Sequence, residues 1–232
     1  MVVRALRTLF VLSFFTVVGL VPASFAQAKT TLTLSAFNDY LCSGISQTNK
    51  NPAVQANLNW MSDSGFHANA YASRVDFDGI NVEADVTAGY FKQLTDDLSY
   101  DVGATQYSYF GKHGSSVNNY TEFYATMTYV YSTIIGFYTT DYAGAGARYY
   151  NVKFVQTLPL TDRWSLLGGI GYSKSLDMDK WSRENRAGYS HWRAGAHYAF
   201  DGYELSAEVQ GTSLDHTGDT RLVFGVAKTF DL

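Results

Sequence analysis

The sequence predicts an all-β protein, a transmembrane antiparallel up-and-down β-barrel of about 12 strands with both chain ends on the periplasmic side. Three observations lead to this fold class. Apolar and polar residues alternate with a period of two along most of the chain. The connections between the alternating segments are short and longer in turn. A leader typical of exported proteins precedes the first segment.

Residues 1–28 have the three-part layout of a secretory signal peptide. Arg4 and Arg7 precede an apolar run, and small residues lead up to Ala28. The apolar run is shorter than the roughly 20 residues that a membrane-spanning helix needs, so a cleaved signal is favoured over an uncleaved anchor. We expect cleavage after Ala28, although the cleavage rule is also met about two residues earlier. The mature chain would then be a single barrel domain over residues 29–232.

Composition excludes several other classes of protein. Loss of the leader removes two Arg and no acidic residue, which shifts the net charge from −4 to −6 and leaves no basic surface for nucleic acid. After the leader, no apolar run approaches the length of a transmembrane helix, so the chain could cross a membrane only with strands. Cys42 is the only cysteine, which excludes a disulfide within the chain and leaves an incidental thiol. The 18 Tyr, 15 Phe and 20 Gly against 3 Pro are typical of strands.

The clearest alternation runs over residues 81–92. Val82 and Val86 fall on one face of this segment, and Glu83 and Asp85 fall on the other. A helix would repeat its apolar residues every three or four positions, so these segments are not helical. The same period predicts strands at 30–40, 53–61, 66–75, 81–93, 98–110, 119–130, 132–142, 148–158, 164–175, 189–200, 203–213 and 220–230.

The connections separate a membrane barrel from a soluble β-sandwich, the alternative fold that shares this composition. Short periplasmic turns opposite longer outer loops are expected of outer-membrane barrels, and an even number of strands places both termini on one side. A sandwich gives no reason for such alternation. The short connections are predicted at 62–65, 94–97, around Tyr131, at 159–162 and at 201–202, with longer and more polar connections between them.

Aromatic residues and the last segment give further support. Aromatic side chains near strand ends are typical of the girdles at the two membrane interfaces. The segment 221–232 keeps apolar residues in one alternating phase to its end, interrupted by Lys228, as in strands that the barrel-assembly machinery recognises. The expected girdle residues are Trp60, Phe66, Trp164, Trp192, Phe200, Tyr203 and Phe230.

Residues 37–55 resemble the opening motif of the proteobacterial family Gcw_chp, also called TorF-like, whose members are regarded as porins of the outer membrane. Further similarity at 75–77, 96–103 and 223–230 extends the resemblance over essentially the whole mature chain. Ser43 stands where the family usually has Arg, so any role of that Arg cannot be transferred. The resemblance implies an outer-membrane barrel and names no solute.

In a closed barrel, the polar faces of the strands line the interior. Their charged residues would set ion selectivity in a water-filled lumen, or pair across a narrow lumen and close it. We therefore expect a passive diffusion channel for small hydrophilic solutes or ions, and keep a non-conducting structural or adhesive barrel as the alternative. The predicted lining residues are Glu83, Asp85, Asp101, Glu122, Lys153, His191, Arg193, His197, Glu204, Glu208 and Arg221.

The expected surroundings follow from this fold class. The protein would lie in the outer membrane of a Gram-negative bacterium, in contact with lipid and lipopolysaccharide, after insertion by the assembly machinery through its C-terminal strand. The charged segment 175–188 is expected to be a solvated loop, a cover over the outer mouth, or a site for lipopolysaccharide phosphates. The sequence does not decide whether residues 43–53 lie outside the barrel or inside it.

Catalysis and metal binding have weaker support. An outer-rim hydrolase or acyltransferase would need Ser, His and a carboxylate in mutual contact, and sequence proximity alone does not give that geometry. We therefore expect no enzymatic activity. The five histidines show no ligand spacing, so no metal or cofactor is expected. The candidates for a catalytic group are His191 beside Ser190, His113 near Ser115 and Ser116, and His216 beside Asp215 and near Asp219.

Overall fold

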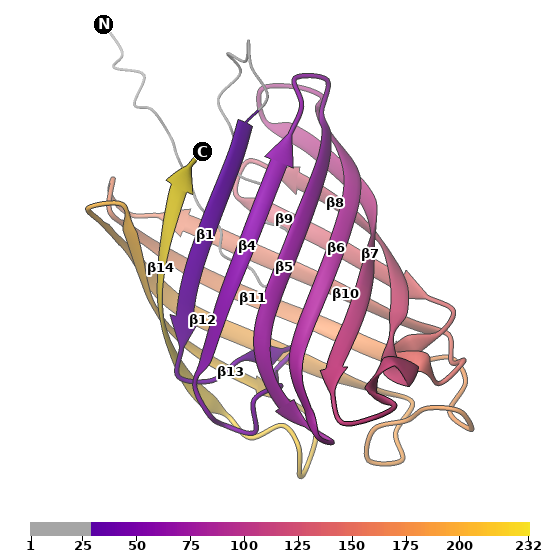
Figure 1. The fold of residues 1–232 in the computed structure, drawn as a ribbon. Coiled ribbons are helices and arrows are strands. Elements are labelled where there is room, and N and C mark those ends of the chain that lie inside the picture. The colour runs from indigo at the N-terminus through magenta and orange to yellow at the C-terminus, as the bar shows by residue number, and fades with distance from the viewer. Residues whose placement is uncertain (1–28) are drawn as a thin grey trace, which may run out of the picture.

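A computed structural model describes residues 29–232, which form a closed barrel of twelve antiparallel strands (Figure 1). The predicted fold class is confirmed, and each barrel strand begins and ends within three residues of its predicted bounds. The expected signal peptide lies outside the described residues. The strands of the barrel are β1 (Lys29–Phe37), β4 (Ala53–Met61), β5 (Phe66–Phe77), β6 (Ile80–Gln93), β7 (Leu98–Gly111), β8 (Tyr120–Tyr129), β9 (Ser132–Thr139), β10 (Tyr149–Pro159), β11 (Trp164–Ser175), β12 (Gly188–Phe200), β13 (Tyr203–Thr212) and β14 (Arg221–Asp231).

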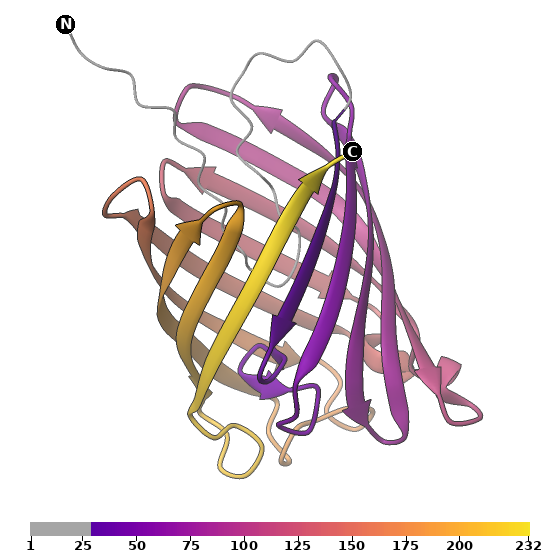
Figure 2. The ribbon, with the colours of Figure 1, turned by 60° about the vertical axis from the view of Figure 1, so that its left-hand side comes forward.

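Each strand pairs with its neighbours in the chain, and β1 closes the barrel. It pairs with β4 on one side and with β14 on the other, so that Leu32 lies opposite both Leu58 and Phe230. Figure 2 shows β1 and β14, the first and last barrel strands, side by side. No sheet edge is left unpaired around the barrel. Closure therefore satisfies the backbone hydrogen bonds of every strand, which a bilayer interior requires.

The alternation along the strands separates an apolar outer face from a polar inner face. On β6, Val82 and Val86 are 43% and 62% exposed, whereas Glu83 and Asp85 are 4% and 5% exposed. Large apolar side chains are exposed on every barrel strand. Such a surface is unfavourable in water and suits the hydrocarbon of a bilayer. Within residues 29–232, no helix is long and apolar enough to span a membrane.

The two ends of the barrel differ in their connections. At one end, here called the turn end, the connections are 62–65, 94–97, 130–131, 160–163 and 201–202, and β1 starts and β14 ends there. The opposite end, the loop end, carries 38–52, 112–119, 140–148, 176–187 and 213–220. Two of these loops contain short 3-10 helices, η1 (Ser115–Asn118) and η2 (Tyr142–Gly144).

The predicted alternation of short and longer connections is wrong at one hairpin of the loop end. β5 and β6 are joined by Asp78 and Gly79 alone. Both residues have positive φ, 51° and 77°, as a tight two-residue turn requires. Both strands extend further toward the loop end than their alternation predicts, so only two residues remain to connect them.

Aromatic side chains form a belt on the outside of the turn end. Six of the seven expected girdle residues lie at the turn end of their strands and are between 39% and 60% exposed, namely Trp60, Phe66, Trp164, Phe200, Tyr203 and Phe230. Trp192 is the exception, because it lies inside β12 opposite Ile170. Lys228 interrupts the apolar phase of β14, and its ammonium lies 4.1 Å from the centroid of the Tyr203 ring. A long Lys side chain can reach the interface in this way.

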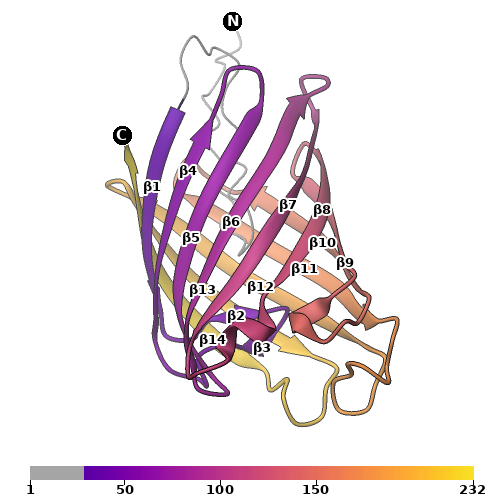
Figure 3. The same ribbon diagram turned by 45° about the vertical axis from the view of Figure 1, so that its right-hand side comes forward.

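The first loop enters the barrel instead of extending away from it (Figure 3). Its strands β2 (Leu41–Cys42) and β3 (Ile45–Ser46) form a small hairpin, and we call residues 39–48 the inner hairpin. Tyr40 and Thr48 are 1% and 0% exposed, although both belong to a loop. Part of the segment 43–53, whose place the sequence did not decide, therefore lies in the lumen.

Candidate pore

The structure places all eleven predicted lining residues on inward-facing positions of the barrel. Each belongs to the face of its strand opposite the exposed apolar side chains. Most of them gather around the inner hairpin in the half of the lumen nearer the loop end. Asp101, His197 and Glu204 lie nearer the turn end, since their positions are closer to the turn-end termini of β7, β12 and β13.

Carboxylates form one wall of the half of the lumen nearer the loop end, and we call it the acidic wall. Glu83 and Asp85 lie on β6, and Glu122 lies on β8. The hydroxyl of Tyr109 donates to Glu83 Oε1 at 3.2 Å, and that of Tyr107 donates to Glu122 Oε1 at 3.1 Å. Glu83 Oε2 and Asp85 Oδ1 are buried and accept no hydrogen bond from the described residues. A buried carboxylate oxygen without a partner is costly unless water or a cation reaches it.

Cationic and imidazole side chains form a second wall, the basic wall. Lys153 lies on β10, and His191 and Arg193 lie on β12. The strand between them presents Gly169 and Gly171 to the lumen. A Cβ on Gly171 would overlap the His191 ring, and one on Gly169 would lie 3.3 Å from Arg193 Cγ. The two glycines therefore leave room for the basic side chains to lie across β11.

Ionic contacts and hydrogen bonds surround His197 nearer the turn end. His197 lies between two carboxylates, with Nδ1 3.0 Å from Glu204 and Nε2 3.0 Å from Glu208. Gln210 donates to the other oxygen of Glu208 at 3.2 Å, and Arg193 lies 3.8 Å from the same oxygen. These groups are satisfied locally, unlike Glu83 Oε2 and Asp85 Oδ1 of the acidic wall.

A second buried cluster includes two residues that the sequence analysis missed. His67 Nε2 lies 3.0 Å from Asp101 Oδ1, and the Tyr124 hydroxyl donates to the same oxygen at 3.1 Å. His67 shares the inward phase of β5 with Asn69, so alternation could have identified it. Gly89 and Gly103 face this cluster, and a Cβ on either would approach the Tyr124 hydroxyl to 2.5 or 2.6 Å.

The inner hairpin is fixed to the barrel wall by polar contacts. Asp39 Oδ2 lies 3.2 Å from Arg221 Nη2 on β14, and Asn151 Nδ2 on β10 donates to Ser43 Oγ at 2.8 Å. Gly44 has a φ of 78°, and a Cβ there would lie 2.5 Å from Thr212 Cγ2. A larger residue at this position would push the hairpin from the wall.

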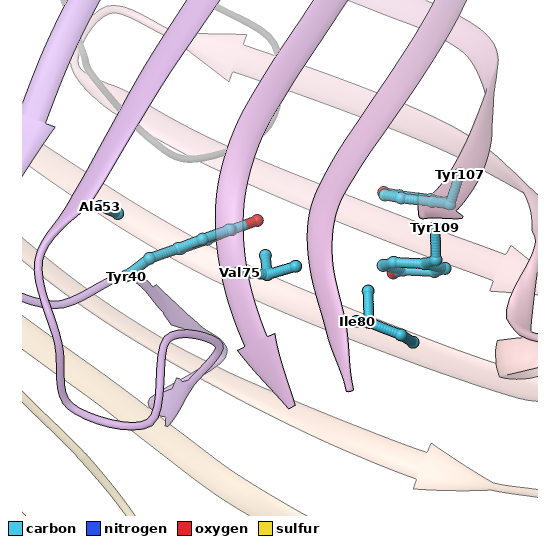
Figure 4. Packing of buried hydrophobic residues seen from close by; sticks show 6 residues of the cluster. All are labelled: Tyr40, Ala53, Val75, Ile80, Tyr107 and Tyr109. Carbon is cyan, nitrogen blue, oxygen red and sulfur yellow. The ribbon is translucent and has the colours of Figure 1, made fainter. Parts of the chain in front are cut away.

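An apolar contact supports the same attachment. Tyr40 extends from the hairpin toward the inner face of β5, where Val75 lies, in a cluster that also contains Tyr107 and Tyr109 (Figure 4). The polar anchors of the hairpin involve side chains that are distant in sequence, so local pattern could not identify them.

Cavities adjoin the inner hairpin along the lumen. The cavity nearest the loop end, here called the outer cavity, has a volume of about 70 Å³, and its lining includes Glu83, Glu122 and Lys153. The middle cavity, of about 60 Å³, shares Cys42, Ser43 and Lys153 with it. A smaller cavity of about 20 Å³ continues toward His197 and Glu204. Since one water needs roughly 10–15 Å³ on this measure, the first two cavities are each large enough for several waters.

The loop 176–187 is tied to its neighbours over the loop end. The guanidinium of Arg148 donates to both oxygens of Asp177 at 3.0 and 2.8 Å, and these hydrogen bonds hold the pKa of Asp177 well below its ordinary value. Trp181 packs edge-on against Tyr142 and Tyr149, with centroids 4.6 and 5.4 Å away. The charged segment is therefore attached to its neighbours at the loop end, while Asp179, Lys180 and Arg186 remain exposed to solvent.

Glu184 connects the same loop to the loop 213–220. Its carboxylate accepts hydrogen bonds from the backbone N–H groups of Asp215, His216 and Thr217 at 2.8, 3.0 and 2.8 Å. Partial burial raises the pKa of Glu184, but these donors and the Thr217 hydroxyl outweigh it and lower the pKa to about 2. The carboxylate thus acts as an ionised clasp between two loops.

The structure does not bring the catalytic candidates into contact with serine. Ser190 is exposed and His191 is buried, because adjacent strand residues point to opposite faces. His113 is exposed, and near it Ser115 Oγ donates to the backbone of Tyr109. The backbone N–H of His216 donates to Glu184. Across residues 29–232, no group of three or more His, Cys, Asp or Glu could hold a metal ion.

Comparison with known proteins gives a family and structural relatives. The profile of the family described as "Bacterial protein of unknown function (Gcw_chp)" matches residues 23–230. The KdgM porin is similar in structure with a TM-score of 0.60 at 12% identity, over 86% of this chain and 99% of that one. The NanC porin is similar with a TM-score of 0.59 at 11% identity, over 87% and 100%. A structure of the KdgM porin in complex with oligogalacturonate has a TM-score of 0.58 at 12% identity, over 87% and 99%. No curated protein sequence matches the chain.

Proposed function

Because the chain belongs to the Gcw_chp family and folds as a twelve-strand barrel with an apolar outer face, we propose that it is an outer-membrane porin. It would act as a passive diffusion channel for small hydrophilic solutes or ions. Buried charge carries this proposal. Glu83 Oε2, Asp85 Oδ1 and Asp101 Oδ2 are buried without a hydrogen-bond partner among the described residues, and a lumen filled with water supplies one.

The proposed orientation follows from the two barrel ends. The turn end would face the periplasm and the loop end the exterior, as in other barrels with short turns and long loops. Residues 1–28 would direct export, and the C-terminal strand β14 would be recognised during assembly. Lipid would contact the apolar outer face of the barrel, and lipopolysaccharide would contact the loop end.

The lining charges indicate the expected ion preference. Among the eleven lining residues, six are acidic and three are Lys or Arg. A net negative lumen favours cations, and the preference should weaken at high salt because the charges are screened. The oligogalacturonate of the KdgM complex is a ligand of that protein. Both signs of charge occur in the present lumen, so the proposal is not limited to anions.

The inner hairpin favours a second candidate function. Tyr40 and Leu41 are 1% and 4% exposed in the lumen, and the adjoining cavities are small. A barrel filled in this way could be a non-conducting structural or adhesive protein. Conduction then decides between the two functions.

Single-channel conductance of the refolded mature protein in a planar bilayer tests the proposal. We expect discrete steps with a preference for cations. Changing Glu83, Asp85, Glu204 and Glu208 to Gln or Asn should reduce that preference, whereas Lys92→Gln on the exposed turn end of β6 should not. If the barrel shows no conductance although its heat-modifiable gel migration shows that it is folded, the non-conducting candidate is supported.

A further inference from the structure

The outer cavity presents both signs of charge on one small surface. Its lining includes Glu83 and Glu122 from the acidic wall, together with Lys153 and Arg183. Glu83 and Glu122 are 4% and 6% exposed, so bulk water screens them weakly. Arg183 comes from the loop 176–187 and lies over Trp181, with its guanidinium 5.5 Å from that ring. Any solute in this cavity meets carboxylates and cations together.

The acidic side is suited to an ammonium group. Glu83 Oε2 is buried and accepts no hydrogen bond from the described residues, which leaves it available to a cationic donor. The Tyr109 hydroxyl donates to the other oxygen of Glu83, and the Tyr107 hydroxyl donates to Glu122 Oε1. Their rings line the same cavity, where aromatic faces attract a cation. Carboxylates among tyrosine rings are a typical environment for an organic ammonium.

The basic side is suited to a carboxylate-sized anionic group. Lys153 lines the outer cavity together with Glu122 and the middle cavity together with Arg193. Arg183 Nε is buried and donates no hydrogen bond within the described chain. A cation bound at the carboxylates would be repelled by Lys153 and Arg183, and an anion bound at these would be repelled by the carboxylates. A solute with both charges avoids each repulsion.

We propose that the outer cavity is a binding site for a small zwitterion. Its ammonium group lies against Glu83 and Glu122, and its acidic group lies against Lys153 and Arg183. The volume of about 70 Å³ limits the solute to a few heavy atoms, the scale of a small amino acid. This inference rests on the proposed porin function and names the class of solute that it favours.

Isothermal titration calorimetry of the refolded barrel in detergent, at neutral pH, tests the site. Glycine is the zwitterionic probe, and methylammonium and acetate each carry one of its charges. Glycine is expected to bind at least about tenfold more tightly than either, the scale of one charge-assisted hydrogen bond. Glu122→Gln and Lys153→Gln should each weaken glycine binding by a similar factor. Glu83→Gln and Arg183→Gln provide a second variant on each side if the first does not fold.

The matched controls are Lys92→Gln and Asp201→Asn, which change exposed charges at the turn end and should leave glycine binding unchanged. Equal binding of the three probes, or glycine binding that survives loss of both charge signs, would overturn the site. Conductance is measured on the same preparations. A barrel that conducts without binding glycine overturns the site and leaves the porin proposal intact. A barrel that binds glycine without conducting overturns the porin proposal and supports the site.

Discussion

Asp39 and Arg221 form an ion pair of 3.2 Å that joins the inner hairpin to the last barrel strand. The Asp39 side chain is 1% exposed and that of Arg221 is 28% exposed. The other carboxylate oxygen of Asp39 accepts hydrogen bonds from Ser46 at 2.6 Å and from Thr48 at 2.9 Å. One carboxylate therefore holds the hairpin together and attaches it to the wall.

The first prediction concerns this ion pair. Arg221→Gln leaves the buried Asp39 charge without its partner and should lower the free energy of unfolding by about 2 kcal/mol, less than for a fully buried pair. It should also loosen the hairpin, so that single-channel currents fluctuate more. Urea unfolding and bilayer recordings measure the two effects. As a control, Lys29→Gln removes an exposed pair with Asp231 and should change stability by less than about 1 kcal/mol. Equal stability losses in both variants would contradict the assigned anchor.

The second prediction uses Cys42, which lines both the outer and the middle cavity. A small water-soluble thiol reagent should attach to it and fill part of the passage. We expect the conductance of the open channel to fall after labelling, and mass spectrometry to show one added group. Cys42→Ser should be insensitive to the reagent. Full labelling with unchanged conductance would show that solutes pass elsewhere.

The third prediction concerns the glycines beside His67 and Tyr124. A Cβ on Gly103 would lie 2.5 Å from the backbone oxygen of Ala88 and 2.6 Å from the Tyr124 hydroxyl. Gly103→Ala should therefore lower stability by about 1–3 kcal/mol through overpacking. Gly168→Ala is the matched control, because nothing lies within 4 Å of its added Cβ. Heat-modifiable migration on gels gives the midpoint temperature of unfolding for both variants. A decrease in the Gly168→Ala midpoint as large as that in Gly103→Ala would reject overpacking as the cause.

The fourth prediction is a pH dependence of the loop end. The folded-state pKa of Glu184 is about 2, below its ordinary value of 4.5. Its contribution to docking of the loop 213–220 is therefore complete above about pH 4.5 and is lost as the pH falls through about 2. Glu184→Ala should remove the dependence and speed amide exchange at Asp215, His216 and Thr217 by about tenfold at neutral pH.

Hydrogen exchange followed by mass spectrometry measures this release. Glu204→Gln changes an acidic residue of the lumen that has no contact with the loop, so its loop exchange should stay slow. If the loop exchanges equally fast in the unchanged protein and in Glu184→Ala, the clasp has no influence on loop order.

Alternation predicted the barrel well because it is a property of each strand alone. The segment with Val82 and Val86 outward and Glu83 and Asp85 inward keeps this arrangement in the structure. Side-chain direction on a strand follows from sequence position, and burial on one side fixes the register. Inward-facing charges could therefore be predicted without knowing the partners of each strand.

The inner hairpin could not be predicted in the same way. Its two strands contain two residues each, too few to show a period. Its position depends on contacts that are distant in sequence, such as Ser43 with Asn151 and Asp39 with Arg221.

Closure of the barrel by β1 and β14 has a consequence for the order of assembly. Leu32 must find Phe230, so the wall cannot be completed until the last residues of the chain are present. A truncated chain would keep two open strand edges and be prone to pair with other chains. Because the partner of Asp39 lies on β14, the contact between the inner hairpin and that strand also depends on closure. The pairing that completes the barrel wall therefore also brings the inner hairpin to its ionic partner on that wall.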